Sequence, residues 1–189
     1  MVLPLIALLV SGDTNLVQAA QKILDSKYYA FAVMVIANQE CKALDEARTL
    51  GFDHYLLTAE KEIEQQLDAH APALVLCAGY NQQLSSVFVE KYRGRLVNFH
   101  PSLLPAFAGL FDVAVHAAVL GRGCRISGVT VHFIDADLDT GKILFQLPVA
   151  VDEFDSPESL KKKVQGVAAE LLPKVIALAI DGKLQRLLA

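Results

Sequence analysis

Three polar side chains have the types and spacing that acyl transfer to an amine requires. Asn98 and His100 stand two residues apart, so an extended backbone directs both to the same side, and Asp139 follows farther along the chain. An amide N–H can donate to the oxygen that becomes negative when an amine attacks an acyl carbon. An imidazole can move the proton of that amine, and a carboxylate can orient the imidazole and favour its charged form. We therefore expect Asn98, His100 and Asp139 to form a catalytic set.

The same three residues also have a purely structural interpretation. Asn98 and His100 could satisfy loop backbone groups before Pro101, and Asp139 could belong to a plain Leu-Asp-Thr-Gly turn. Spacing alone does not bring Asp139 into contact with the imidazole, so both interpretations stay open at this point.

Two further polar residues lie on one face of an expected strand. Alternation over residues 127–134 places Thr130 and His132 together, and we expect both to support the catalytic set as neighbours. His116 is expected to pack along its helix.

A metal centre is not expected. The separations of His100, His116 and His132 match no zinc-ligand motif. Aspartates alternate at Asp135, Asp137 and Asp139 as in a calcium loop, but the glycine and terminal glutamate of that loop are absent.

The elements around these residues predict where they lie. The apolar residues Leu96 and Val97 are typical of a buried strand. Pro101 lacks a backbone N–H, so regular strand pairing is expected to end before it. Asn98 and His100 are therefore expected where the chain leaves the carboxyl end of that strand. In open α/β sheets this edge is where ligands bind.

The rest of the chain alternates apolar strands with helices. Further strands are expected at 5–10, 29–36, 54–57, 73–78, 127–134 and 143–151, and helices at 16–24, 41–50, 59–70, 85–92, 113–120 and 156–180. Pro148 indicates that the last strand lies near an edge, and Pro173 is expected to kink or split the last helix. This order predicts an α/β fold with a mostly parallel, doubly wound, Rossmann-like sheet, and residues 1–189 are expected to form one domain.

The composition of the chain indicates which kind of molecule it binds and in which cell compartment it lies. The chain has 189 residues, of which 53% are hydrophobic, and a formal net charge of -4. It offers no broad positive field for nucleic acid, so small-molecule substrates fit better. Its three cysteines have no paired spacing, which favours the cytoplasm. The apolar run of residues 1–10 falls short of the about 20 residues that span a bilayer, so no membrane association is expected.

Several motifs together resemble those of the folate-dependent formyltransferases. They are Asn98-Phe-His-Pro-Ser-Leu-Leu-Pro105, Gly128-Val-Thr-Val-His132, Asp137-Leu-Asp-Thr-Gly141 and Gln146. The likeness runs from the first strand to Gly182. It implies that Asn98, His100 and Asp139 are the catalytic asparagine, histidine and aspartate, and that 10-formyltetrahydrofolate is the formyl donor, with no metal.

The resemblance also implies where both substrates bind. The folate pteridine is expected against two loops, and the donor-binding residues would be Asn81, Gln82, Gln83, Leu84, Asn98, Asp135, Ala136, Asp137, Leu138 and Asp139. The acceptor is expected near the first loop and the last helix, at Gly12, Thr14, Asn15 and Gln165. Glycinamide ribonucleotide, an intermediate of purine biosynthesis, is the leading acceptor.

The acceptor side departs from the family pattern in two places. The loop Ser11-Gly-Asp-Thr-Asn15 is one residue shorter than the usual loop, lacks its second glycine and places Asp13 where an anion would approach. Ala168 stands where the family has a glutamate. A plain strand-to-helix loop capped by Thr14 or Asn15 also remains open.

Two alternative functions therefore stay open. In the first, the same chemistry serves another amine, such as an amino sugar nucleotide. In the second, the protein binds folate without transferring anything, although such a protein would have no chemical need for a proton-transfer set.

Overall fold

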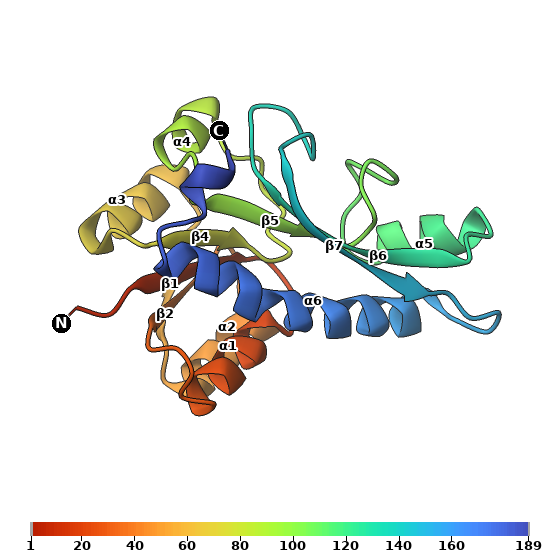
Figure 1. Cartoon of the computed structure of the whole chain (residues 1–189), viewed down its shortest axis with the longest axis horizontal. Coiled ribbons are helices and arrows are strands. Elements are labelled where there is room, and N and C mark those ends of the chain that lie inside the picture. The colour runs from red at the N-terminus through yellow and green to blue at the C-terminus, as the bar shows by residue number, and fades with distance from the viewer. Residues whose placement is uncertain (1, 189) are drawn as a thin grey trace.

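The computed structural model describes residues 2–188, which form a seven-stranded sheet with helices on both faces (Figure 1). The strands are β1 (Leu5–Val10), β2 (Ala32–Ala37), β3 (Asp53–Leu56), β4 (Leu74–Cys77), β5 (Leu96–His100), β6 (Ile126–Phe133) and β7 (Ile143–Ala150). The helices are α1 (Leu16–Asp25), α2 (Lys42–Leu50), α3 (Glu60–His70), α4 (Ser86–Lys91), α5 (Val113–Gly121), α6 (Pro157–Ile180) and the short 3-10 helix η1 (Gln185–Leu187).

The strand order is β3-β2-β1-β4-β5-β6-β7. Strands β1 to β5 pair in parallel, whereas β6 and β7 add to the sheet in antiparallel fashion. The order reverses between β1 and β4, and ligands bind at such a switch point in doubly wound sheets. The predicted mostly parallel, doubly wound architecture is confirmed.

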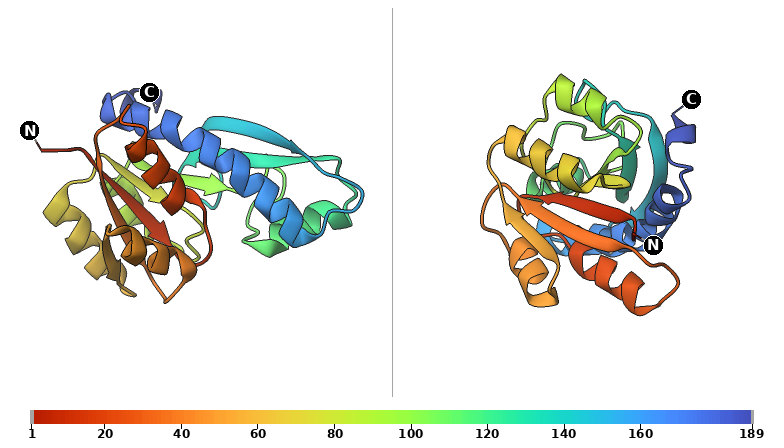
Figure 2. Two further views of the ribbon diagram at one scale, coloured as in Figure 1. Left: turned by 90° about the horizontal axis from the view of Figure 1, so that it is seen from below. Right: turned by 90° about the vertical axis from the view of Figure 1, so that its left-hand side faces the viewer.

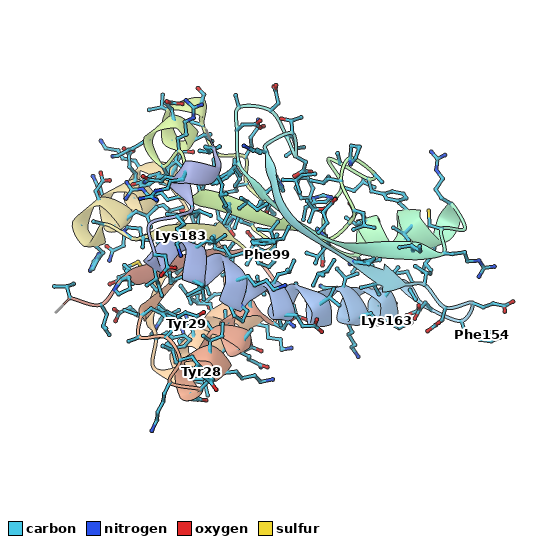
Figure 3. The ribbon with its side chains drawn as sticks, in the orientation of Figure 1. Tyr28, Tyr29, Phe99, Phe154, Lys163 and Lys183 are labelled. Carbon is cyan, nitrogen blue, oxygen red and sulfur yellow. The ribbon has the colours of Figure 1, made fainter. Side chains whose placement is uncertain are left out.

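Two apolar clusters cover the two faces of the sheet. Within β1, Ile6 and Leu8 point into a large cluster with α1, α2 and α6, while Ala7 and Leu9 point into a smaller one with α3 and α4. This is why β1 is apolar throughout. Figure 2 shows the two helical layers on opposite sides of the sheet. Phe99 points to the α6 face (Figure 3), so its sequence neighbours Asn98 and His100 point to the other.

Strand β5 is longer than predicted. It extends to His100, so Asn98 and His100 lie within the strand and do not follow it. The cause is pairing on both sides, because β4 places Cys77 beside Asn98 and β6 places His132 beside Asn98. The backbone pairing with neighbouring strands therefore keeps Asn98 and His100 in extended strand conformation.

Helix α6 is one uninterrupted element, so Pro173, expected to kink or split the helix, does not split it. A proline inside a helix removes one backbone hydrogen bond. Buried side chains on both sides of it, Leu171, Leu172, Val175 and Ile176, pack into the large cluster and hold the helix together. Its start is as predicted, with Ser156 as the N-cap and Pro157 at the first helical position.

The remaining strand ends follow from their neighbours. Strand β2 begins at Ala32, later than predicted, because Ala32 pairs with Leu5, the first residue of β1. Strand β7 forms an edge of the sheet, as Pro148 predicted. None of the helices within residues 2–188 combines the length and apolar composition that a bilayer-spanning helix requires.

Candidate active site

The fold brings His100 and Asp139 together at the carboxyl end of β5. His100 Nδ1 lies 3.3 Å from Asp139 Oδ2, and the two side chains are 2% and 3% exposed. His100 Nε2 is buried and has no hydrogen-bond partner among the described residues. One ring nitrogen thus faces the carboxylate, and the other is left for a bound molecule.

The backbone around Asp139 fixes the position of its carboxylate. The N–H of Gly109 donates to Asp139 Oδ2 at 2.9 Å, and Asp139 itself has a φ of 57°, a left-handed conformation uncommon outside glycine. At Gly141, a Cβ atom would lie 1.7 Å from the carbonyl oxygen of Phe133. Only glycine permits this close approach of the loop to β6.

The charge on Asp139 is strongly stabilised. Burial opposes it, but the contact with His100 and the hydrogen bond from the Gly109 N–H outweigh burial and hold the pKa of Asp139 well below its usual range. The carboxylate is therefore negative at neutral pH, and its Oδ2 atom faces Nδ1 of His100.

The register of β5 and β6 places His132 opposite Asn98. His132 Nδ1 lies 2.8 Å from the Phe133 carbonyl oxygen and must carry a hydrogen, so in the neutral ring Nε2 accepts from the Asn98 amide at 3.2 Å. The second N–H of that amide has no hydrogen-bond partner among residues 2–188. His132, expected as a supporting neighbour, contacts Asn98 directly and lies 3.6 Å from Asp139 Oδ1.

Thr130 fixes the loop that follows His100. Its hydroxyl donates to the Ser102 carbonyl at 2.7 Å and accepts from the Leu104 N–H at 2.9 Å and from Gln146 at 3.0 Å. Thr130 is paired with His100 across the strands, yet its hydroxyl is fully used in fixing the loop that follows His100. Thr130 therefore supports His100 and Asp139 through this loop, which also supplies the Gly109 N–H that donates to Asp139.

A first cavity of about 270 Å³ opens beside Asn98 on the α4 face. Every residue predicted to bind the donor lines it, namely Asn81, Gln82, Gln83, Leu84, Asn98, Asp135, Ala136, Asp137, Leu138 and Asp139. The cavity is also lined by largely apolar side chains, namely Cys77, Tyr80, Val89 and Ile134. A flat, largely apolar heterocycle with a few polar groups suits such a cavity.

A second cavity, of about 300 Å³, lies between the loop after β1 and α6. Gly12, Thr14 and Gln165 line it, as expected for the acceptor side. Asn15 is not among its lining residues, because its amide donates to the Gln165 carbonyl at 2.7 Å. Asn15 is the N-cap of α1 without a side-chain cap bond, whereas Thr14 Oγ1 accepts from the Leu16 N–H at 3.3 Å.

The charges of the second cavity are already paired. Lys161 Nζ lies 2.5 Å from Asp112 Oδ1, and Lys42 Nζ lies 3.3 Å from Asp13 Oδ1. Ala168, the residue in place of the family glutamate, is buried and packs in the large core cluster. Acidic and basic groups therefore balance around this cavity.

The two cavities meet at Asn98. Asp139 lines only the first cavity, and His100 lines only the second. The residues that line both cavities are Tyr80, Asn81, Asn98 and Phe111. The His100–Asp139 contact thus crosses the boundary between the two cavities. Two molecules bound side by side in these cavities would meet beside Asn98. Within residues 2–188, no group of three or more histidine, cysteine or acidic side chains could hold a metal ion.

A Rossmann-like sheet whose switch-point edge has two adjoining cavities, with an amide, an imidazole and a carboxylate between them, suits an enzyme that transfers a group from one small molecule to another. The family model described as "Formyl transferase" matches residues 5–176, and the chain belongs to this family. Among curated relatives, the phosphoribosylglycinamide formyltransferase of Mycobacterium tuberculosis H37Rv is 36% identical, covering 94% of this chain and 86% of that protein. The Escherichia coli protein of the same name is 32% identical, over 95% of this chain and 89% of that one.

A solved structure agrees with this assignment. The phosphoribosylglycinamide formyltransferase of Anaplasma phagocytophilum superposes with a TM-score of 0.85 at 28% identity, covering 95% of this chain and 87% of that chain. The family resemblance read from the sequence motifs is confirmed.

Sequence reasoning missed two contributors to the site. Gly109 has no side chain to signal its N–H bond to Asp139, and His116 lines the second cavity although it was expected only to pack along its helix. The antiparallel pairing of β5 with β6 would have revealed the contact between His132 and Asn98, had that register been predicted.

Proposed function

We propose that this protein transfers a formyl group from 10-formyltetrahydrofolate to the primary amine of glycinamide ribonucleotide, a step of purine biosynthesis. The observation that carries the proposal is the position of Asn98 in the wall shared by two cavities, with the His100–Asp139 pair beside it. The names of the relatives support the same reaction and acceptor.

The donor occupies the first cavity in this proposal. The pteridine lies between the loops 81–84 and 135–139, and the formyl group reaches Asn98. The acceptor occupies the second cavity, where its amine approaches the same carbon from the side of His100. Both substrates are small molecules, and the three unpaired cysteines suit a reducing cytoplasm.

The chemistry follows from these positions. The amine nitrogen attacks the formyl carbon, a C–N bond forms, and negative charge develops on the formyl oxygen, to which the free N–H of Asn98 donates. His100 Nε2 takes a proton from the amine, and Asp139 stabilises the resulting imidazolium. The bond from the formyl carbon to N10 then breaks, and His100 returns the proton to N10.

The test is an assay of the purified protein with 10-formyltetrahydrofolate and glycinamide ribonucleotide, following the release of tetrahydrofolate and the formylated product. We expect product in amounts equal to the tetrahydrofolate released, and little release when the amine is left out. Donor binding without transfer to any amine would overturn the proposal and favour a folate-binding protein.

A second candidate keeps the chemistry and changes the acceptor. It is favoured by the second cavity, in which Lys161, the lining residue with a fixed positive charge, is paired with Asp112, and Asp13 places a carboxylate beside the loop. A carboxylate beside the cavity repels a phosphate group, because both are negatively charged. A panel of amines, including amino sugar nucleotides, with the same donor decides between them, because kcat/KM will be highest for the true acceptor.

A further inference from the structure

The second cavity contains a histidine that the proposed chemistry does not use. His116 lies on α5, is 1% exposed and lines this cavity together with His100, Lys161 and Val164. Its Nδ1 atom is buried and has no hydrogen-bond partner among the described residues. Buried polar groups are satisfied in the great majority of cases, so an unpartnered ring nitrogen on a residue that lines a cavity indicates a partner that arrives with the ligand.

The surroundings of His116 keep its ring uncharged. Burial, helped by the positive charge of Lys161 and opposed by Asp112, lowers the pKa of His116 to about 4. At neutral pH the ring therefore offers one N–H donor and one nitrogen acceptor, and no positive charge.

The charged neighbours of His116 neutralise each other. Lys161 is 17% exposed and reaches Asp112 at 2.5 Å, so this end of the cavity carries one paired positive and one paired negative group beside a neutral ring. A phosphate finds no unpaired positive charge here. A hydroxyl or amide group, which both donates and accepts, matches what His116 presents.

We infer that His116 binds an uncharged hydroxyl or amide group of the acceptor and thereby determines which amine is used. The inference rests on the proposed function, because it assigns the second cavity to the acceptor. Glycinamide ribonucleotide has ribose hydroxyls and an amide that satisfy this requirement. His116 is a specificity-determining residue here, and His100 remains the residue that moves the proton.

Two substitutions separate a polar contact from simple packing. His116→Phe keeps an aromatic ring in the core and removes both nitrogens, whereas His116→Asn keeps a polar group near the place of Nδ1. We expect His116→Phe to raise KM for glycinamide ribonucleotide about tenfold or more, because an unpaired substrate group is left in the cavity. We expect kcat to change less than about threefold and KM for 10-formyltetrahydrofolate to stay unchanged, since His116 does not line the first cavity. His116→Asn should recover part of the lost affinity.

The controls distinguish failure of this inference from failure of the proposed function. His70→Phe, at an exposed position on α3, should leave all three constants unchanged. If the unaltered protein does not formylate glycinamide ribonucleotide, the proposed function fails. If it does, and His116→Phe retains the original KM, only the inference about His116 fails.

A measurement on the unaltered protein covers the case in which His116→Phe does not fold. In the NMR spectrum of protein labelled in its histidine rings, the His116 signals should shift on addition of glycinamide ribonucleotide alone. Signals that stay in place at saturating ligand would overturn the inference.

Discussion

At the scale of single residues, the site divides its tasks between the two cavities. His100 lines only the second cavity, Asp139 only the first, and Asn98 both. Each residue can therefore be removed with a different effect on binding and on turnover. Within His100, Nδ1 faces Asp139, whereas Nε2 has no hydrogen-bond partner among the described residues.

Replacement of His100 should affect turnover alone. We expect His100→Ala to lower kcat by about 10²- to 10⁴-fold, the usual contribution of a general acid–base group, with the donor Kd unchanged. Rapid-mixing kinetics and fluorescence titration with folate measure the two constants, with His70→Ala as the surface control. Near-normal kcat in His100→Ala would remove this residue from the mechanism.

Replacement of Asn98 should affect both binding and turnover. Asn98→Ala is expected to lower kcat about a hundredfold or more, because the developing oxyanion loses its donor. It should also weaken donor binding, since Asn98 lines the first cavity, which we propose for the donor. An unchanged kcat with weaker donor binding would show that the amide serves binding alone.

The depressed pKa of Asp139 predicts how stability depends on pH. The folded state favours the carboxylate, so this contribution to the free energy of unfolding is complete above the ordinary carboxyl pKa of 3.8 and is lost as pH falls below it. Asp139→Asn does not titrate. Urea unfolding between pH 7 and pH 3 should therefore show the original protein more stable near neutrality, with a difference that shrinks as pH falls. A difference that is constant over this range would contradict the assignment.

At the scale of elements, the site depends on two loops that meet the end of β5. The loop after β5 supplies the Gly109 N–H, and the loop between β6 and β7 supplies Asp139. Thr130 fixes the first loop, and the close approach at Gly141 fixes the second. The geometry of the catalytic set is therefore set by backbone positions outside the set itself.

Gly141 offers a test of this support. A methyl group there would lie 1.7 Å from the Phe133 carbonyl oxygen, so Gly141→Ala must displace the loop that contains Asp139. We expect a lower Tm and a kcat reduced at least tenfold, because small displacements of catalytic groups are costly. The matched control is Gly166→Ala in α6, where no atom lies within 4 Å and alanine should raise stability by up to about 1 kcal/mol. Normal kcat in Gly141→Ala would show that the loop tolerates the shift.

At the scale of the whole molecule, α6 joins the two parts of the sheet. Its buried side chains share one apolar cluster with residues of β1, β2, β5 and β6, and Figure 1 shows it running along the long axis of the molecule. The parallel strands and the antiparallel pair β6–β7 therefore depend on the same core.

This shared core predicts one cooperative unfolding transition. All five tyrosines lie at or before Tyr92, so tyrosine fluorescence reports on the first half of the chain, while far-UV circular dichroism reports on all of it. We expect the two signals to give the same midpoint in urea. Two separate midpoints would show that residues 1–189 do not unfold as a single unit.

The amino-acid sequence by itself determined the alternation of strands and helices, the mostly parallel sheet and the residue types of the site. These follow from local patterns, since apolar runs, caps and the motif around Asn98 act within a few residues. Only the tertiary structure decided that His100 meets Asp139, that His132 meets Asn98 and that His116 lines the second cavity. Such contacts depend on the register between strands and on how closely loops approach one another. Both involve residues far apart in the chain, and a local sequence pattern specifies neither.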